Sequence, residues 1–326
     1  MRGLSSKEYK LFEQLVALTQ KEMHGTMTAF LKSGYKNVVS KDKFIYAEGN
    51  IPIALVAHMD TVFTNPTDDV YYDPRKNVLW SPDGLGADDR AGIFAIVQIV
   101  MHTKLRPHII FTTDEELGCI GANELAKMPC PFKDLKYIIQ LDRRGANDCV
   151  FYDCFNPKFT AYVESFGFVE NWGTYSDISS LCPAWQVCGV NLSIGYYDEH
   201  SVSETLHVGQ MFNTIEKIKK MLMAQDIPSF EYKRKSPSHM GYLAGTLNKY
   251  SEEMVTCKGC GATVPEWETF PVKGIDGKVV HYCVDCVPGH VEWCESCQEP
   301  YELDPEDTYG LNLCPDCVEA LLNETH

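Results

Sequence analysis

The sequence lacks a hydrophobic run long enough to cross a membrane. The longest apolar stretch, residues 91–101, is interrupted by Gln98 and is far shorter than the roughly 18 to 20 residues that a span needs. The first ten residues carry charges where a secretory signal peptide would have its apolar segment. We therefore expect a protein without membrane contact or export signal, in a reducing, cytoplasmic setting.

Basic residues are scarce in the last part of the chain. Residues 251–326 contain no arginine and three lysines, against 16 Asp and Glu residues. This segment carries −13 of the formal net charge of −16, which leaves −3 for residues 1–250. Nucleic-acid affinity depends on Lys and Arg side chains that displace counterions from phosphates. The charge distribution therefore disfavours nucleic acid as a partner.

The composition and length are those of a folded protein with more than one domain. The chain has 326 residues, of which 44% are hydrophobic and 23% charged. Residues 227–253 lose hydrophobic periodicity and contain Pro228, Pro237 and Gly241, which is typical of a linker. We expect a catalytic domain over residues 1–226, a linker over 227–253 and a small module over 254–326.

Apolar runs alternate with helical patterns in the first region. Runs at 53–57, 109–113, 137–141 and 187–194 have strand character, and residues 92–102, 122–128 and 209–223 have helical spacing. Continuous apolar strands between helices predict an α/β fold with a mainly parallel (mixed) sheet sandwiched by helices. We also expect one helix that begins at Ser5 or Ser6 and extends past Leu18 to Met23, and one strand over residues 38–46.

Acidic and histidine residues gather where the predicted strands end. In open α/β sheets, ligands bind beyond the carboxyl ends of the strands. Carboxylates mixed with two imidazoles suit Zn²⁺, Mn²⁺ or Co²⁺, and one carboxylate can bridge two cations. The sequence therefore predicts a pair of catalytic metal ions. The segments are His58-Met59-Asp60, Gly86 to Gly92 with Asp88 and Asp89, Asp114-Glu115-Glu116, Asp142-Arg143-Arg144 and Glu199-His200-Ser201.

These five segments, in this order, resemble the co-catalytic two-zinc exopeptidases, a superfamily that includes peptidase T, related carboxypeptidases and zinc aminopeptidases. The resemblance covers roughly residues 1–225 and implies the zinc-exopeptidase (phosphorylase/hydrolase-like) architecture. It implies that His58 and Asp142 hold one zinc ion and that Glu116 and His200 hold the other. Asp88 would bridge the two ions, with the adjacent Asp89 as the alternative.

The resemblance also implies two roles beside the metals. Asp60 would hydrogen-bond the second ring nitrogen of His58 and fix its tautomer. Glu115 would be the general base that takes a proton from the attacking water and passes it to the leaving amine.

The chain departs from the family in ways that concern the substrate. Only 57 residues separate Asp142 from His200, which leaves no room for the lid or dimerisation domain inserted there in peptidase T. Arg90 replaces the usual Lys or Asn of the second segment, while His200-Ser201 followed by Glu204 resembles the late motif of the tetrahedral aminopeptidases. Arg143 and Arg144 either bind a substrate carboxylate or neutralise nearby acidic groups.

Eight cysteines form four pairs after residue 250, each with two intervening residues. The pairs are separated by 22, 7 and 16 residues. Two such pairs supply the four thiolates of a closed structural zinc site, so the tail predicts two further zinc ions. Sequential ligation would resemble tandem zinc ribbons, whereas a cross-braced arrangement would resemble a RING domain. The predicted ligands are Cys257, Cys260, Cys283 and Cys286 for one site and Cys294, Cys297, Cys314 and Cys317 for the other.

Two classes of function follow from these patterns. The first is a di-zinc metallohydrolase that cleaves peptide bonds of short peptides, as an aminopeptidase or dipeptidase, with a deacylase of N-acyl substrates as the variant. The second is an inactive hydrolase scaffold that serves as a zinc-finger adaptor. The acidic tail is expected to dock a protein partner or to cap the catalytic domain, and the sequence leaves the oligomeric state open.

Overall fold

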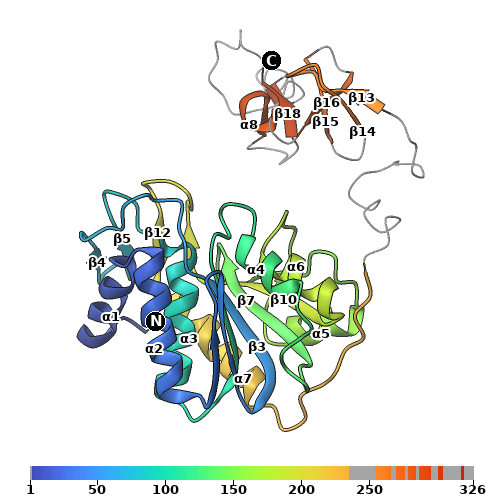
Figure 1. Ribbon diagram of the computed structural model, residues 1–326. Coiled ribbons are helices and arrows are strands. Elements are labelled where there is room, and N and C mark those ends of the chain that lie inside the picture. Colours follow the sequence, from blue (N-terminus) through green and yellow to red (C-terminus); the bar gives the residue numbers. More distant parts are fainter. Residues whose placement is uncertain are drawn as a thin grey trace. The chain divides into compact units, whose positions relative to one another are not determined.

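The computed structural model describes residues 2–234, 254–265, 269–275, 278–283, 286–294, 300–303 and 317–318. The chain divides into two compact units, Met1–Ser236 and Pro237–His326 (Figure 1). The first unit contains all five polar segments, and the second contains the paired cysteines.

An eight-stranded mixed sheet forms the centre of the first unit. Its strands are β1 (Asn37–Ser40), β2 (Phe44–Glu48), β3 (Ile51–His58), β6 (Pro107–Thr112), β7 (Tyr137–Arg143), β8 (Asp148–Val150), β9 (Val169–Glu170) and β10 (Cys188–Ser193). The strand order is β1-β2-β6-β3-β7-β10-β8-β9, and the central strands β6, β3, β7 and β10 are parallel. The predicted mainly parallel sheet is confirmed.

Helices cover both faces of this sheet. They are α1 (Ser6–Val16), α2 (Gln20–Gly34), α3 (Ala87–His102), α4 (Ile120–Ala126), α5 (Pro157–Glu164), α6 (Asp177–Trp185) and α7 (Val208–Leu222). Successive strand residues point to opposite faces, so Ile53 and Leu55 join the core under α3 and α7, whereas Ala54 and Val56 join the core under α4 and α6. Because both faces are buried, the strand reads as a continuous apolar run.

A small second sheet lies at the end of the unit that carries the polar segments. It is formed by β4 (Tyr71–Asp73), β5 (Val78–Trp80), β11 (Tyr196–Tyr197) and β12 (Thr205–His207), in the order β11-β12-β5-β4. The loop between β11 and β12 carries His200. The antiparallel pairing of β11 with β12 thus brings His200, which is distant in the sequence, to the other polar segments.

Two expected elements are each divided in the structure. The expected single N-terminal helix is two helices, because Thr19 caps α2 with a second capping box in which Glu22 bonds back to Thr19. The Thr-x-x-Glu pattern was present in the sequence as its signal. The expected strand over residues 38–46 is the antiparallel hairpin of β1 and β2.

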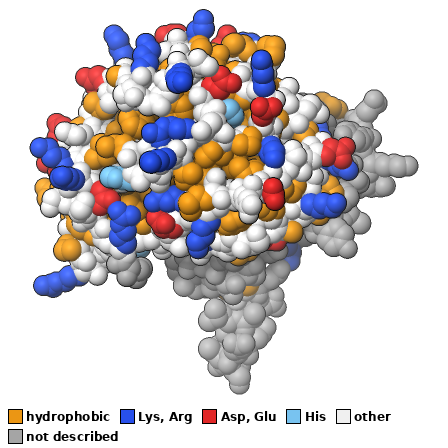
Figure 2. Space-filling view, turned by 90° about the horizontal axis from the view of Figure 1, so that it is seen from below, with side chains coloured by type: hydrophobic (Ala, Val, Ile, Leu, Met, Phe, Trp, Pro, Cys, Tyr) orange, Lys and Arg blue, Asp and Glu red, His pale blue; other side chains and the backbone are white. Residues whose placement is uncertain are grey.

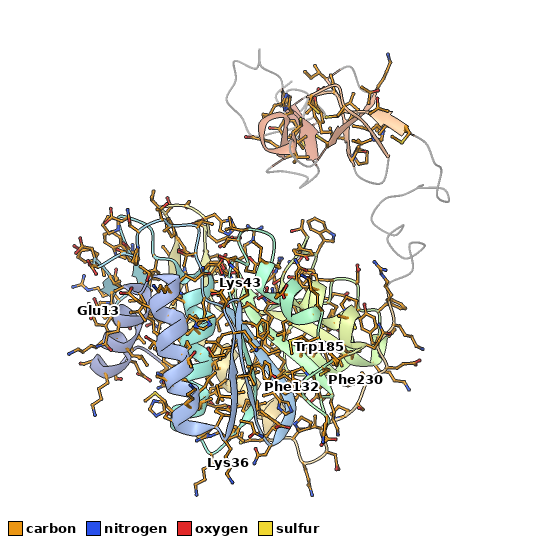
Figure 3. All side chains as sticks on the ribbon, viewed as in Figure 1. Glu13, Lys36, Lys43, Phe132, Trp185 and Phe230 are labelled. Carbon is orange, nitrogen blue, oxygen red and sulfur yellow. The ribbon has the colours of Figure 1, made fainter. Side chains whose placement is uncertain are left out.

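The expected linker begins later than residue 227. Asn156 donates to the carbonyl of Glu231 at 2.9 Å, and the amide of Phe155 donates to that of Lys233 at 2.7 Å. The Phe230 ring, labelled in Figure 3, packs 4.9 Å from the Phe159 ring, measured between centroids. Residues 227–234 therefore belong to the first unit. The segment escaped prediction because it packs as an irregular strap without helix or strand periodicity.

The second unit combines its paired cysteines with short strands. The strands are β13 (Met254–Thr256), β14 (Thr263–Pro265), β15 (Thr269–Lys273), β16 (Val279–Cys283), β17 (Val291–Trp293) and β18 (Pro300–Glu302), and α8 covers Val287–His290. A sheet of order β16-β15-β18-β17 spans both cysteine halves. Buried Glu302 joins them as well, because it accepts hydrogen bonds from Tyr282 and Lys258. The two halves thus share a sheet instead of forming two separate modules.

The surface of the first unit carries both signs of charge. Figure 2 shows one face, on which Lys and Arg side chains are spread around hydrophobic and uncharged surface with Asp and Glu between them. On this face the described residues form no continuous basic stripe of the kind that binds nucleic acid. Among the residues that the structure describes, no helix has the length and apolar character that crossing a membrane requires.

Candidate active site

His58 lies at the carboxyl end of β3 and is fully buried. Its Nε2 atom is 3.0 Å from Asp88 Oδ1 and 3.6 Å from Asp142 Oδ1. Its Nδ1 atom is 3.3 Å from Asp60 Oδ1. Because β3 and β7 are adjacent and parallel, residues at their ends converge although 84 positions separate them in the sequence. One ring nitrogen therefore faces two carboxylates, and the other faces a third.

The second oxygen of Asp88 faces the other histidine. Asp88 Oδ2 is 3.2 Å from His200 Nε2, and Glu116 Oε2 is 3.0 Å from the same nitrogen. The described residues thus form two groups with metal-ligand geometry, one of His58, Asp88 and Asp142 and one of Asp88, Glu116 and His200. Asp88 is the shared member.

The spacing of these atoms fits zinc. Tetrahedral ligands about 2.0 to 2.1 Å from a zinc ion lie about 3.3 Å from one another. The ligand-to-ligand distances of 3.0 to 3.6 Å are close to that value. Glu116 Oε1 is also buried and finds no hydrogen-bond partner among the described residues. The site therefore offers each of two ions three protein ligands and leaves room for water or substrate.

Asp89 points away from these groups. Its Oδ2 accepts the backbone N–H of His58 at 3.2 Å, and its Oδ1 accepts that of Gly92 at 3.0 Å. A Cβ atom at Gly92 would lie 2.3 Å from Asp89 Oδ1 and 2.4 Å from the Leu141 carbonyl oxygen, so glycine is required where α3 crosses β7. Asp88 lies in both metal groups and Asp89 in neither.

The electrostatics of the site call for cations. Burial opposes the charge of His58, but Asp142, Asp60 and Asp88 outweigh it and raise the pKa of this histidine well above its usual value. Hydrogen bonds to Asp88 and Glu116 raise the pKa of His200 to about 11. Burial, with the neighbouring Asp88, raises the pKa of Asp142 to about 6. Crowded negative charge contributes to all three shifts, and bound metal ions would neutralise it.

These shifts predict that zinc binding releases protons. Without metal, neighbouring carboxylates raise the pKa of His58 and bring that of His200 to about 11, whereas metal ligation requires the neutral imidazole. We expect release of protons as the site fills, so zinc affinity rises with pH. Calorimetry at pH 7 in buffers of different ionisation enthalpy measures the number. A binding heat that is the same in every buffer would contradict the prediction.

Glu115 follows β6 and lines a cleft of about 190 Å³ over the two metal groups. The thiol of Cys119 donates to Glu115 Oε1 at 3.4 Å. Burial raises the pKa of Glu115 to about 9, and the nearby carboxylates of Asp142 and Asp177 add to the effect. Beside bound metal ions, which would lower this pKa and leave the group ionised, the carboxylate could accept a proton from water.

Glu204 supports Asp88 from behind. This fully buried side chain accepts the backbone N–H groups of Ala87 at 3.1 Å and Asp88 at 3.0 Å. Burial raises its pKa to about 8. The sequence showed Glu204 only as part of the late motif and assigned it no role, because its partners lie 116 and 117 positions away.

We expect Glu204→Ala to weaken zinc binding about 10- to 100-fold, because two buried N–H groups lose their acceptor and the Asp88 backbone loses its support. Glu204→Gln keeps one acceptor oxygen, so its zinc affinity should lie between those of Glu204→Ala and the native protein. Competition with a chromogenic chelator measures the affinity. Native affinity in the alanine variant would show that Glu204 does not position Asp88.

Hydrogen bonds from several elements also hold Asp142. Its Oδ2 accepts from Ser176 at 2.8 Å and from Gln140 at 3.0 Å, and its Oδ1 accepts from Tyr196 at 3.2 Å. Such outer contacts orient metal ligands. None was predicted, since each of these three residue types is also common at positions without such a role.

Arg143 and Arg144 line the same cleft, and each lies near an acidic residue. Arg143 Nη2 is 3.6 Å from Asp148 Oδ2, and Arg144 Nη1 is 3.2 Å from Glu199 Oε1. Both predicted uses, binding a substrate carboxylate and neutralising acidic groups, are compatible with this placement.

The first four cysteines of the tail come together in the second unit. One ligand atom from each of Cys257, Cys260, Cys283 and Cys286 lies within 4.8 Å of the others. This is the sequential pairing of the first two cysteine pairs. Burial opposes ionisation of Cys257, but the N–H of Cys283, 3.2 Å away, and those of Cys260 and Gly259 hold its pKa at about 6. A thiolate there is ready to bind zinc.

The second cysteine set is described only in part. Cys294 is buried and Cys317 packs near it in one small hydrophobic cluster. Cys297 and Cys314 lie outside the described residues.

The sheet, the shared carboxylate and the adjacent Glu115 define a metal-dependent hydrolase domain. Residues 37–165 match the model of Peptidase family M28. This match confirms the predicted resemblance to the co-catalytic exopeptidases and supports a metallopeptidase domain in the first unit. A comparison with curated protein sequences finds no match.

Solved structures show the same fold. A tripeptidase from Staphylococcus aureus is 13% identical, with a TM-score of 0.53 over 65% of this chain and 95% of its own. A TET aminopeptidase from a marine sediment thaumarchaeon is 13% identical, with a TM-score of 0.53 over 68% and 98%. An aminopeptidase from Desulfurococcus kamchatkensis is 12% identical, with a TM-score of 0.51 over 65% and 93%. At this identity the likeness establishes the fold.

Proposed function

We propose that the first unit is a co-catalytic two-zinc exopeptidase for short peptides, acting as an aminopeptidase or dipeptidase. The observation that carries this proposal is the placement of Asp88, whose two carboxylate oxygens face two different histidines. A structural metal site needs no such shared ligand, whereas paired catalytic ions a few ångströms apart do.

The residues divide into ligands and residues that act beside them. His58, Asp88 and Asp142 would hold one zinc ion, and Asp88, Glu116 and His200 the other. Asp60 would orient the His58 ring through Nδ1, and its Oδ2 also accepts the N–H of Glu116 at 3.0 Å. One carboxylate thereby positions a ligand of each ion.

The proposed reaction is hydrolysis of an amide bond. Two bound cations would polarise the amide carbonyl and lower the pKa of the attacking water. Glu115 takes the proton of that water as its oxygen bonds to the carbonyl carbon. When the C–N bond breaks, Glu115 returns the proton to the leaving amine. Burial raises the pKa of Glu115 to about 9 in the metal-free site, and two bound cations would lower it again and so leave the carboxylate ionised to take the proton.

A panel of substrates tests this function. Zinc-loaded protein is expected to hydrolyse short peptides with a free amino terminus, and Glu115→Gln is expected to abolish this hydrolysis. Turnover of N-acyl amino acids alone would favour the deacylase. No Glu115-dependent turnover of either class would favour the adaptor.

For the second unit we propose two structural zinc sites and a role in docking a protein partner. The Cys257 cluster supports the first site, and the spacing of Cys294, Cys297, Cys314 and Cys317 in the sequence supports the second. Eight metal-binding thiols would also favour a reducing compartment such as the cytoplasm.

A further inference from the structure

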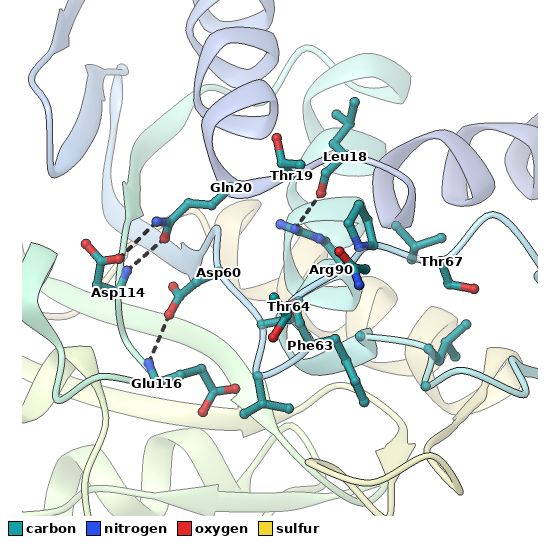
Figure 4. A pocket seen from close by; sticks show the side chains of 18 of the residues that line it. Leu18, Thr19, Gln20, Asp60, Phe63, Thr64, Thr67, Arg90, Asp114 and Glu116 are labelled. Atoms are coloured by element: carbon teal, nitrogen blue, oxygen red, sulfur yellow. Dashed lines mark hydrogen bonds between the residues drawn. The ribbon is translucent and has the colours of Figure 1, made fainter.

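The residues on both sides of Glu115 are held by hydrogen bonds to distant parts of the first unit. Gln20 donates to Asp114 Oδ1 and accepts the N–H of Asp114, each at 2.9 Å (Figure 4). The N–H of Glu116 donates to Asp60 Oδ2 at 3.0 Å (Figure 4). These contacts fix the main chain of the segment, but none of them reaches the carboxylate of Glu115.

That carboxylate receives its hydrogen bond from Cys119, four positions later. Cys119 Sγ is 3.4 Å from Glu115 Oε1, and the cysteine is fully buried. No other side chain among the described residues hydrogen-bonds this carboxylate. The contact occupies Oε1 and leaves Oε2 without a protein donor, while Glu115 lines the cleft over the two metal groups.

A tight turn returns Cys119 to Glu115. The N–H groups of Gly118 and Cys119 both donate to the Glu115 carbonyl oxygen, each at 2.8 Å. Both residues have left-handed backbone conformations, with φ values of +97° and +52°. This conformation is common for glycine but uncommon for cysteine. Such conformations persist where the surrounding structure requires them, often at functional sites.

Close packing holds the turn in place. A Cβ atom at Gly121, the second residue of α4, would lie 2.4 Å from the Lys43 carbonyl oxygen and 2.7 Å from that of Thr113. The start of α4 therefore packs directly against neighbouring backbone. Asn123 Nδ2 also donates to the Gly118 carbonyl at 2.9 Å. The turn has little freedom to move the thiol away from the carboxylate.

The thiol remains protonated and can therefore donate. Burial, followed by the negative charges of Asp177 and Glu115, raises the pKa of Cys119 well above its usual value. Burial, the largest of these causes, does not depend on the metal ions. A protonated thiol has one hydrogen to donate, whereas a thiolate would repel the carboxylate.

We infer that Cys119 is a positioning residue for Glu115, whose thiol holds Oε1 and thereby directs Oε2 toward the attacking water. The inference rests on the proposed function and concerns how the general base of that site is oriented. A carboxylate free to rotate spends less time in the orientation that transfers a proton. Loss of the contact should therefore lower kcat and leave KM nearly unchanged.

Substitutions of Cys119 in the full, zinc-loaded chain test the inference. Cys119→Ala should lower kcat for dipeptide hydrolysis about 3- to 10-fold, the effect of one hydrogen bond, with KM within about twofold of the native value. Cys119→Ser keeps a donor and should recover most of the native kcat. Native kcat in Cys119→Ala would overturn the inference, and so would an equal loss in the alanine and serine variants.

Two further variants separate positioning from packing and folding. Cys149→Ala is the matched control, because Cys149 is also fully buried but lies on β8 and lines neither metal group. It should leave kcat unchanged even if it lowers the melting temperature. Cys119→Gly removes the thiol at a left-handed position that suits glycine, so it decides the test if Cys119→Ala does not fold.

The two proposals fail in different ways. Hydrolysis that depends on Glu115 but is unchanged by the loss of the Cys119 thiol rejects the positioning role and keeps the peptidase. Absence of Glu115-dependent hydrolysis across the peptide panel rejects the peptidase and, with it, the inference that rests on it.

Discussion

Replacing Glu115 with Gln is expected to lower kcat for peptide hydrolysis about 100- to 10,000-fold. The amide is nearly isosteric with the carboxylate but cannot accept the proton of the attacking water. The metal groups do not include Glu115, so zinc content and thermal stability should remain close to those of the native protein. Steady-state kinetics on a dipeptide panel measure kcat, and metal analysis and thermal unfolding of the same samples measure zinc content and stability.

Glu124→Gln is the matched control for this experiment. Glu124 lies on the exposed side of α4, where it pairs with Lys127. Its replacement should leave kcat unchanged. A Glu115→Gln protein with full zinc content and native kcat would show that another group takes the proton. Because burial raises the pKa of Glu115, the pH dependence of the activity of the native protein also reports on the protonation of Glu115 once the metals are bound.

Replacing Asp88 with Ala should remove both active-site metal ions and lower activity by more than about 1,000-fold, since metal catalysis supplies several kcal/mol. Asp88 is the shared member of both groups, whereas Asp142 and Glu116 each belong to one. Asp142→Ala and Glu116→Ala should therefore each lose one ion. Metal analysis after dialysis against a weak chelator distinguishes the three variants.

Asp83→Ala serves as the control for the Asp88 experiment. Asp83 is an exposed residue of the turn before α3, and its replacement should change neither metal content nor activity. If Asp88→Ala lost only one ion, the carboxylate would belong to a single metal site and the proposed bridge would be wrong.

The main features of the fold could be predicted because they arise from burial. The strands β3, β6 and β7 read as apolar runs since helices cover both faces of the sheet, and polar segments follow them since ligands gather at their carboxyl ends. The order of the candidate ligands was read from the sequence, and their division into two groups around Asp88 came from the resemblance. The structure places the same residues in two such groups.

The features that escaped prediction depend on contacts between distant segments. Glu204 reaches the Asp88 backbone only because β11 and β12 return the chain to the site. The strap over residues 227–234 has no periodic pattern, although the partly buried Phe230 packs against the core. In the second unit, the pairing of Lys273 with Tyr301 joins two cysteine halves that look independent in the sequence.

The number of zinc ions per chain tests the central claim most directly. Native mass spectrometry of the full chain, equilibrated with a modest excess of zinc, should find four ions: two in the first unit and two in the tail. The variant Asp88→Ala should retain two, and Cys257→Ser with Cys283→Ser should retain three. Two ions in the native protein, with the same number in Asp88→Ala, would show that the carboxylate and histidine site binds no metal and would contradict the account.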